Sequence, residues 1–135
     1  MTRLKLAAGL AASLALSVLA APALANSHGN ALVHSRAFNG QTYMMYQNHM
    51  SLYYFDKDGP LASNCTGACA AKWPPATLPA GSRLGENYSL FQRPDGSWQI
   101  AYKGQPLYLY AGDKRPGDIN GDGVGGVWHL QKPTN

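Results

Sequence analysis

The sequence predicts a mainly β fold, in the form of a small single domain of two pseudo-symmetric β-hairpin repeats with long irregular loops and one short disulfide loop. Three observations lead to this prediction. One constant offset, which places Tyr53 on Tyr108, aligns several uncommon residue types. Each half contains two β-prone runs separated by a tight loop, which is the pattern of a hairpin. Two cysteines lie close together in the first half.

The N-terminal segment, residues 1–25, has the three parts of a secretory signal peptide. Two basic residues precede an apolar run over residues 6–21, and Ala23-Leu24-Ala25 supplies a small-residue cleavage site. The apolar run is shorter than the roughly 20 residues that a membrane-spanning helix needs. We therefore expect cleavage after Ala25, and a periplasmic or secreted domain over residues 26–135 with no transmembrane segment.

The composition of this exported part excludes some classes of partner. Its length suits one domain. Nine basic residues face seven acidic ones, which leaves a net charge of +2, and the basic residues do not form a run. Nucleic-acid binding needs a concentrated positive surface. We therefore expect no nucleic acid, and an unknown envelope protein or a small ligand as the partner.

The two cysteines predict a local disulfide bond. Cysteines of exported proteins normally pair, and two cysteines allow a single connectivity, Cys65 with Cys69. The spacing is not the Cys-x-x-Cys of redox sites, and no second cysteine pair is present to complete a zinc site. The closed loop is short, so the bridge is expected to stabilise the fold by roughly 2 to 3 kcal/mol at most.

The internal repeat defines the organisation of the chain. Both halves read Leu-Tyr-x-aromatic-x-x-Asp, followed at the same spacing by Trp. The matched positions of the motif are Tyr53 and Tyr108, Asp58 and Asp113, and Trp73 and Trp128. We predict repeat one over about 42–75, a connector over 76–94 and repeat two over about 97–130.

Each repeat is predicted to begin with a hairpin that has a two-residue loop. These loops are Asn48-His49 and Lys103-Gly104, since Gly and Asn tolerate a positive φ. This pairing places one set of apolar side chains on one face of the hairpins. The set is Tyr43, Met45, Leu52 and Tyr54, with Trp98, Ile100, Leu107 and Leu109 as the matching residues. Aromatic side chains occupy the opposite face, and we expect the two repeat tryptophans to pack on them.

The remaining segments give weaker signals. Residues 56–75 end in Trp-Pro-Pro and are expected to be irregular, with one helical turn near Ala68 to Lys72. Residues 26–37 and 132–135 show no periodicity, and no element is predicted there.

One string resembles part of a calcium-binding loop. Asp118-Ile119-Asn120-Gly121-Asp122-Gly123 has oxygen ligands at alternate positions and a glycine at the turn. The twelfth position is His129 instead of the usual Glu, which argues against an EF-hand. Two interpretations stay open, a looser calcium site and an ordinary Gly/Asp/Asn-rich turn. The candidate calcium ligands are Asp113, Asp118, Asn120 and Asp122.

A second candidate is a copper site at the first hairpin, because thioether and imidazole groups suit copper. Met45, His49 and Met50 are the proposed ligands, and His28 or His34 could join them only if the N-terminal arm folds over the hairpin. The alternative is that Met45 belongs to the core and the others to the surface. A haem-binding role could use the same residues, although no Cys-x-x-Cys-His motif is present.

No catalytic arrangement stands out. The recurring carboxylates, Asp58 and Asp113, follow a strand and suit turn capping by side-chain hydrogen bonds. No hydrolase-type Gly-x-Ser-x-Gly, zinc-type His pair or phosphate loop occurs. We expect a non-enzymatic binding or stress-protection module without a cofactor, and a metal- or haem-binding redox accessory protein is the alternative.

Four strings carry a resemblance to a known family, and together they cover most of the exported part. They are residues 52–58, 65–75, 104–113 and 117–128. With these strings the chain resembles the bacterial secreted repeat family with the Tyr-x4-Asp motif, many of whose members are similar to lipoproteins. The resemblance implies an envelope location and a repeat fold, and it implies no reaction. This chain has no cysteine at the predicted cleavage point that could carry a lipid.

Overall fold

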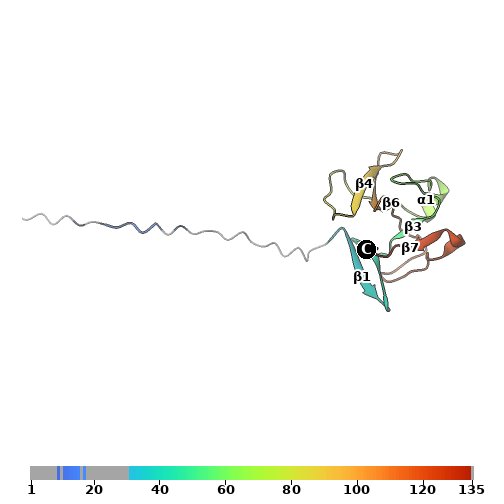
Figure 1. Ribbon diagram of the computed structural model, residues 1–135, viewed down its shortest axis with the longest axis horizontal. Coiled ribbons are helices and arrows are strands. Elements are labelled where there is room, and N and C mark those ends of the chain that lie inside the picture. Colours follow the sequence, from blue (N-terminus) through green and yellow to red (C-terminus); the bar gives the residue numbers. More distant parts are fainter. Residues whose placement is uncertain (1–8, 10, 16, 18–30, 135) are drawn as a thin grey trace, which may run out of the picture.

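The computed structural model describes residues 9, 11–15, 17 and 31–134. The predicted cleavage point lies outside the described residues. Within the described part, no helix is both long enough and apolar enough to cross a membrane. The elements, shown in Figure 1, are β1 (Val33–Phe38), β2 (Gln41–Tyr46), β3 (Tyr53–Phe55), α1 (Ala68–Lys72), β4 (Tyr88–Gln92), β5 (Trp98–Tyr102), β6 (Gln105–Pro106), the 3-10 turn η1 (Val124–Gly126) and β7 (Trp128–Leu130).

The fold is mainly β, as the sequence predicts, and consists of three small antiparallel sheets. β1 pairs with β2, β3 pairs with β7, and β5 lies between β4 and β6. In Figure 1 the β1–β2 hairpin and the β4–β5–β6 sheet lie at opposite ends, with β3 and β7 between them. The helical turn α1 forms where it is predicted, and the Cys65–Cys69 disulfide closes beside it.

A pseudo-twofold axis relates the two repeats. It passes between Tyr53 and Tyr108, whose backbone N–H groups each donate to the carbonyl of the other at 2.9 Å. The surrounding hydrogen bonds come in matched pairs. Ala76 N donates to Leu107 O at 3.0 Å, and at the matching positions Gln131 N donates to Leu52 O at 2.8 Å. Each repeat therefore supplies backbone partners to the other.

The two hairpins differ in the length of their loops. The second has the predicted two-residue turn, in which Lys103 and Gly104 adopt φ values of 47° and 83°. The first has a three-residue loop, because Tyr46 N donates to Met50 O at 2.9 Å and His49 takes the left-handed position with φ 64°.

The longer loop makes the predicted register of the first hairpin wrong by one residue. Met44 and Leu52 share one buried cluster, whereas Tyr43 and Met45 share the other with Tyr53. A one-residue slip moves a strand's side chains to the opposite face. In the second hairpin, Ile100 and Leu107 share a cluster as predicted.

β1 and β4 are strands that the sequence analysis does not assign. They are matching elements, because the first residue of each pairs with the last residue of the strand that follows it. Val33 opposes Tyr46 at the end of β2, and Tyr88 opposes Tyr102 at the end of β5. Asn39 and Gly40 form the turn between β1 and β2 with φ values of 49° and 80°. Asn-Gly is the strongest short-range hairpin signal, so this signal could have identified β1.

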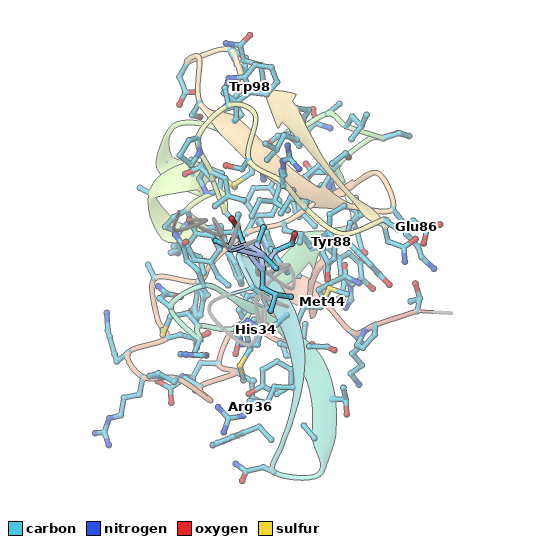
Figure 2. All side chains as sticks on the ribbon, turned by 90° about the vertical axis from the view of Figure 1, so that its left-hand side faces the viewer. His34, Arg36, Met44, Glu86, Tyr88 and Trp98 are labelled. Carbon is cyan, nitrogen blue, oxygen red and sulfur yellow. A yellow bond between two sulfur atoms is a disulfide. The ribbon has the colours of Figure 1, made fainter. Side chains whose placement is uncertain are left out.

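The core consists of an aromatic cluster at the axis and an aliphatic-rich cluster beside it. Four rings stack in the order Phe55, Trp128, Trp73 and Tyr110, with centroid separations of 4.3, 3.9 and 4.3 Å. The prediction that both tryptophans pack on the aromatic face is confirmed. The stack alternates between repeats, because Phe55 lies on the tryptophan of repeat two and Tyr110 on that of repeat one. Figure 2 shows Tyr88 beside Met44, whose sulfur accepts the Tyr88 hydroxyl at 3.4 Å.

Candidate functional site

The repeat motif forms two reciprocal hydrogen bonds across the axis. Tyr53 donates its hydroxyl to Asp113 Oδ2 at 2.6 Å, and Tyr108 donates to Asp58 Oδ2 at 2.5 Å. The tyrosine of each repeat is therefore bound by the aspartate of the other repeat. The second oxygen of each aspartate caps a loop, as predicted for turn capping. Asp58 Oδ1 accepts from Asn64 N at 2.7 Å, and Asp113 Oδ1 accepts from the backbone N of Asn120 at 3.0 Å.

Burial dominates the titration of these groups. It raises the pKa of both Tyr53 and Tyr108, and the hydrogen bond to the partner carboxylate raises the pKa of each further. Burial also raises the pKa of Asp58, although the N–H of Asn64 and the hydroxyl of Tyr108 oppose that shift. The tyrosines are thus held protonated as hydrogen-bond donors, which is the opposite of what a phenolate nucleophile or base needs.

Arg93 is a buried charged residue that the sequence analysis missed, and no local motif marks it. It is only 5 % exposed. Its guanidinium donates to Ser63 Oγ at 2.8 Å, to Gln99 Oε1 at 2.7 Å and to Cys65 O at 2.8 Å. Arg93 therefore ties the disulfide loop of repeat one to the sheet of repeat two, and its neutral partners give it a structural role.

The carboxylates of the calcium-like string each hold a different part of the backbone. Asp118 Oδ2 accepts from Lys114 N at 2.8 Å and Arg115 N at 3.0 Å, and these two hydrogen bonds lower the pKa of Asp118. Asp122 Oδ1 accepts from Leu130 N at 3.0 Å. Among the described residues, no three carboxylate, histidine or cysteine side chains gather as a metal-binding group. The string is built as a hydrogen-bonded turn.

The proposed copper ligands lie in three different environments. Met45 is 1 % exposed and belongs to the aromatic cluster. Met50 lines a surface groove. His49 is exposed and meets His34, a residue of β1, with 3.2 Å between His49 Nδ1 and His34 Nε2. The structure therefore brings together the two histidines, while His28 lies outside the described residues.

The groove beside Met50 is formed by both repeats. Its volume is about 200 Å³. Its lining residues are Asn48, Met50, Ser51 and Pro74 from repeat one, and Leu109, Tyr110 and Asp113 from repeat two. Tyr110 is the half-buried end of the aromatic stack. The lining is thus mainly apolar, and its polar residues are Asn48, Ser51 and Asp113.

A second groove occupies the related place at the other hairpin. Three of its lining residues, Tyr54, Lys103 and Gln105, are the repeat equivalents of Leu109, Asn48 and Met50 of the first groove. The C-terminal segment lies in this second groove, where Lys103 Nζ donates to Thr134 O at 2.9 Å and the Tyr102 hydroxyl donates to the same oxygen at 3.1 Å. The two grooves share their place in the fold but differ in polarity.

A protein-family model described as a secreted repeat of unknown function matches residues 42–77 and again residues 89–132. The chain belongs to this family. The two matched segments follow the two structural repeats, and they confirm the resemblance carried by the Tyr-x4-Asp motif. No curated protein and no solved structure matches the chain. In the structure, repeat one begins before the first matched segment, because β1 pairs with β2 and precedes residue 42.

Proposed function

We propose that this secreted repeat protein is a non-enzymatic binding module, which acts in the periplasm or outside the cell after cleavage near Ala25. The observation that carries the proposal is the reciprocal pairing of the recurring polar groups. At the axis, Tyr53 is hydrogen-bonded to Asp113 and Tyr108 is hydrogen-bonded to Asp58. A general acid or base has to reach a substrate. These tyrosines and aspartates are already hydrogen-bonded within the scaffold. They therefore support a module that binds a ligand at its surface, and not a catalyst.

The groove between the repeats supports a small, largely apolar ligand. An engineered apolar cavity of roughly 150 Å³ binds benzene. The groove's volume of about 200 Å³ suits a single aromatic ring or one apolar side chain of a larger partner. Asn48 is an exposed polar residue of its lining, and a polar group of this kind orients a ligand in an apolar site.

Two-dimensional amide spectra of the exported chain, titrated with indole and with phenol, test this proposal. We expect shifts concentrated at Asn48, Ser51 and Leu109. Met50→Glu should abolish them, because it places a charge in the mainly apolar lining. Leu61→Glu is the matched control, since Leu61 is 46 % exposed and does not line this groove. Shifts scattered over the surface, or shifts that survive Met50→Glu, would overturn the groove as the ligand site.

Elemental analysis and an absorption spectrum of the protein purified from the periplasm without chelator test the alternative functions. A haem band, or stoichiometric iron or copper, would replace the binding-module proposal with a redox accessory role. Stoichiometric calcium that is lost in Asp122→Ala would support an ion at Asp113, Asp118, Asn120 and Asp122. A colourless, metal-free protein that binds indole in the groove would support a module that needs no cofactor.

A further inference from the structure

The histidine pair at the end of the first hairpin is independent of the groove proposal. His34 extends from β1, and His49 extends from the loop after β2. Their nearest nitrogens are 3.2 Å apart, and the rings meet edge to face with centroids 5.1 Å apart. His49 is exposed and His34 is half-buried. Figure 2 shows His34 on β1, at a distance along the domain from Trp98 of the second repeat. The pair is thus accessible to small solutes.

The second repeat shows that the fold does not require histidine at these positions. The residues that match His34 and His49 are Ser89 and Gly104. Ser89 pairs with β5 as His34 pairs with β2, and Gly104, like His49, is the last residue of its loop. The turn position is left-handed in both repeats, with φ 64° at His49 and φ 83° at Gly104. A residue with a Cβ is destabilised there by roughly 1 to 2 kcal/mol relative to glycine. Repeat one carries an imidazole at the position where glycine is the more stable choice.

The separation of the two nitrogens suits two ligands of one metal ion. A metal–nitrogen bond of about 2.0 to 2.1 Å places two neighbouring ligands of a square or tetrahedral ion roughly 2.8 to 3.4 Å apart. The observed 3.2 Å lies within this range. Without metal, one ring donates a hydrogen bond to the other. When an ion binds, that proton moves to the outward nitrogen of the same ring, so both facing nitrogens present lone pairs and the neutral pair keeps its proton count.

We propose that His34 and His49 form an exposed two-histidine site for a divalent transition-metal ion. Imidazole nitrogen is a common ligand for copper, nickel and zinc, and the general order of affinity places Cu²⁺ first. Two protein ligands leave the remaining coordination positions to water or to a group from another molecule. The site is distinct from the combination of Met45, His49 and Met50, because Met45 is enclosed in the aromatic cluster.

The test is a titration of the exported chain with CuCl₂, followed by calorimetry and by electron paramagnetic resonance. His28→Gln is present in every sample, so that the signal reports only on the histidines of the described domain. We expect one equivalent of Cu²⁺ to bind, with hyperfine coupling to two nitrogens and an order of affinity Cu²⁺ above Ni²⁺ and Zn²⁺.

The second repeat supplies variants that keep the fold intact. His34→Ser and His49→Gly copy the residues of repeat two, and each should reduce Cu²⁺ affinity at least about tenfold and remove the two-nitrogen signature. His49→Gly should melt no lower than the parent protein without metal. His129→Gln is the control, because His129 already contacts Asp56 at 2.7 Å, and it should bind Cu²⁺ as the parent does. Unchanged affinity in both hairpin variants, or no stoichiometric binding by the parent, would overturn the site.

Discussion

Replacing Tyr53 with Phe removes one hydroxyl from the axis while it keeps the ring that packs edge-on against Trp73. The hydroxyl donates to the carboxylate of Asp113, which is 7 % exposed. A hydrogen bond to a charged group contributes about 1.5 to 3 kcal/mol, and the carboxylate left behind keeps its bonds to Asn120. We expect Tyr53→Phe to lower the free energy of unfolding by about 2 kcal/mol. Tyr108→Phe should have an effect of similar size, because the arrangement is symmetric.

Guanidinium unfolding followed by tryptophan fluorescence measures this effect, since Trp73 and Trp128 are stacked at 3.9 Å in the folded state. A loss of about 2 kcal/mol is a large part of the roughly 5 to 15 kcal/mol that stabilises a typical domain. Tyr54→Phe is the matched control, because the Tyr54 hydroxyl makes no hydrogen bond among the described residues and its ring stacks on His129. If Tyr53→Phe were no more destabilising than Tyr54→Phe, the reciprocal bonds would not stabilise the fold and the reasoning would be refuted.

Three further predictions follow from the core, the axis and the loops. Above pH 10, Tyr53 loses its proton in the unfolded state but keeps it in the folded state, where its pKa is raised. The free energy of unfolding therefore falls as the pH rises. Denaturant unfolding at several alkaline pH values should show this fall to be shallower in Tyr53→Phe by about 1.4 kcal/mol per pH unit. In the same unfolding assay, Trp73→Ala should destabilise the fold by about 3 to 5 kcal/mol. Trp98→Ala should destabilise it clearly less, because Trp98 is half-buried and lies outside both clusters. Asp122→Ala should lower the free energy of unfolding by about 1 kcal/mol, because the hydrogen bond to Leu130 N is lost. CaCl₂ should leave the melting temperatures of the parent protein and of this variant unchanged. A calcium-dependent rise in melting temperature in the parent alone would instead place an ion in that loop.

Much of the fold could be predicted because the duplication repeats rare residue types at one offset. Tryptophans at matching positions pointed to one shared aromatic core, and they stack on each other in the structure. The register of the first hairpin could not be predicted in the same way. Two- and three-residue loops are both common, and Asn48 and His49 both tolerate a positive φ. One added loop residue then reversed the faces of Met44 and Met45.

The polar pairs across the axis were beyond the sequence for a different reason. Tyr-x4-Asp has the same spacing in both repeats, so bonding within a repeat and exchange between repeats give the same pattern. The exchange becomes visible only when the axis is placed between Tyr53 and Tyr108. The sequence offers His34 as a partner of His49 only on the condition that the N-terminal arm folds over the hairpin. Without an assigned β1, nothing in the sequence shows that this condition is met.

The exchange between repeats means that neither repeat can complete the core alone. Trp73 of repeat one lies between Tyr110 and Trp128 of repeat two, and the hydroxyl of Tyr53 ends on Asp113. A single repeat would leave these surfaces open, and the arrangement that closes them is that of a twofold dimer interface, in which the same patch on each half covers the other.

Because both repeats must satisfy this shared interface, the axis leaves little freedom for a ligand site. The two repeats carry different residue types at the tips of their hairpins, the loops 47–49 and 103–104. The left-handed position at these tips accepts histidine in one repeat and glycine in the other. His49 takes the left-handed position that Gly104 takes in the second repeat, and Met50 takes the groove position of Gln105. Substitutions at the tips should therefore change binding and leave stability nearly intact, whereas substitutions at the axis should change stability first. A protein whose ligand affinity followed only the axis residues would not fit this division.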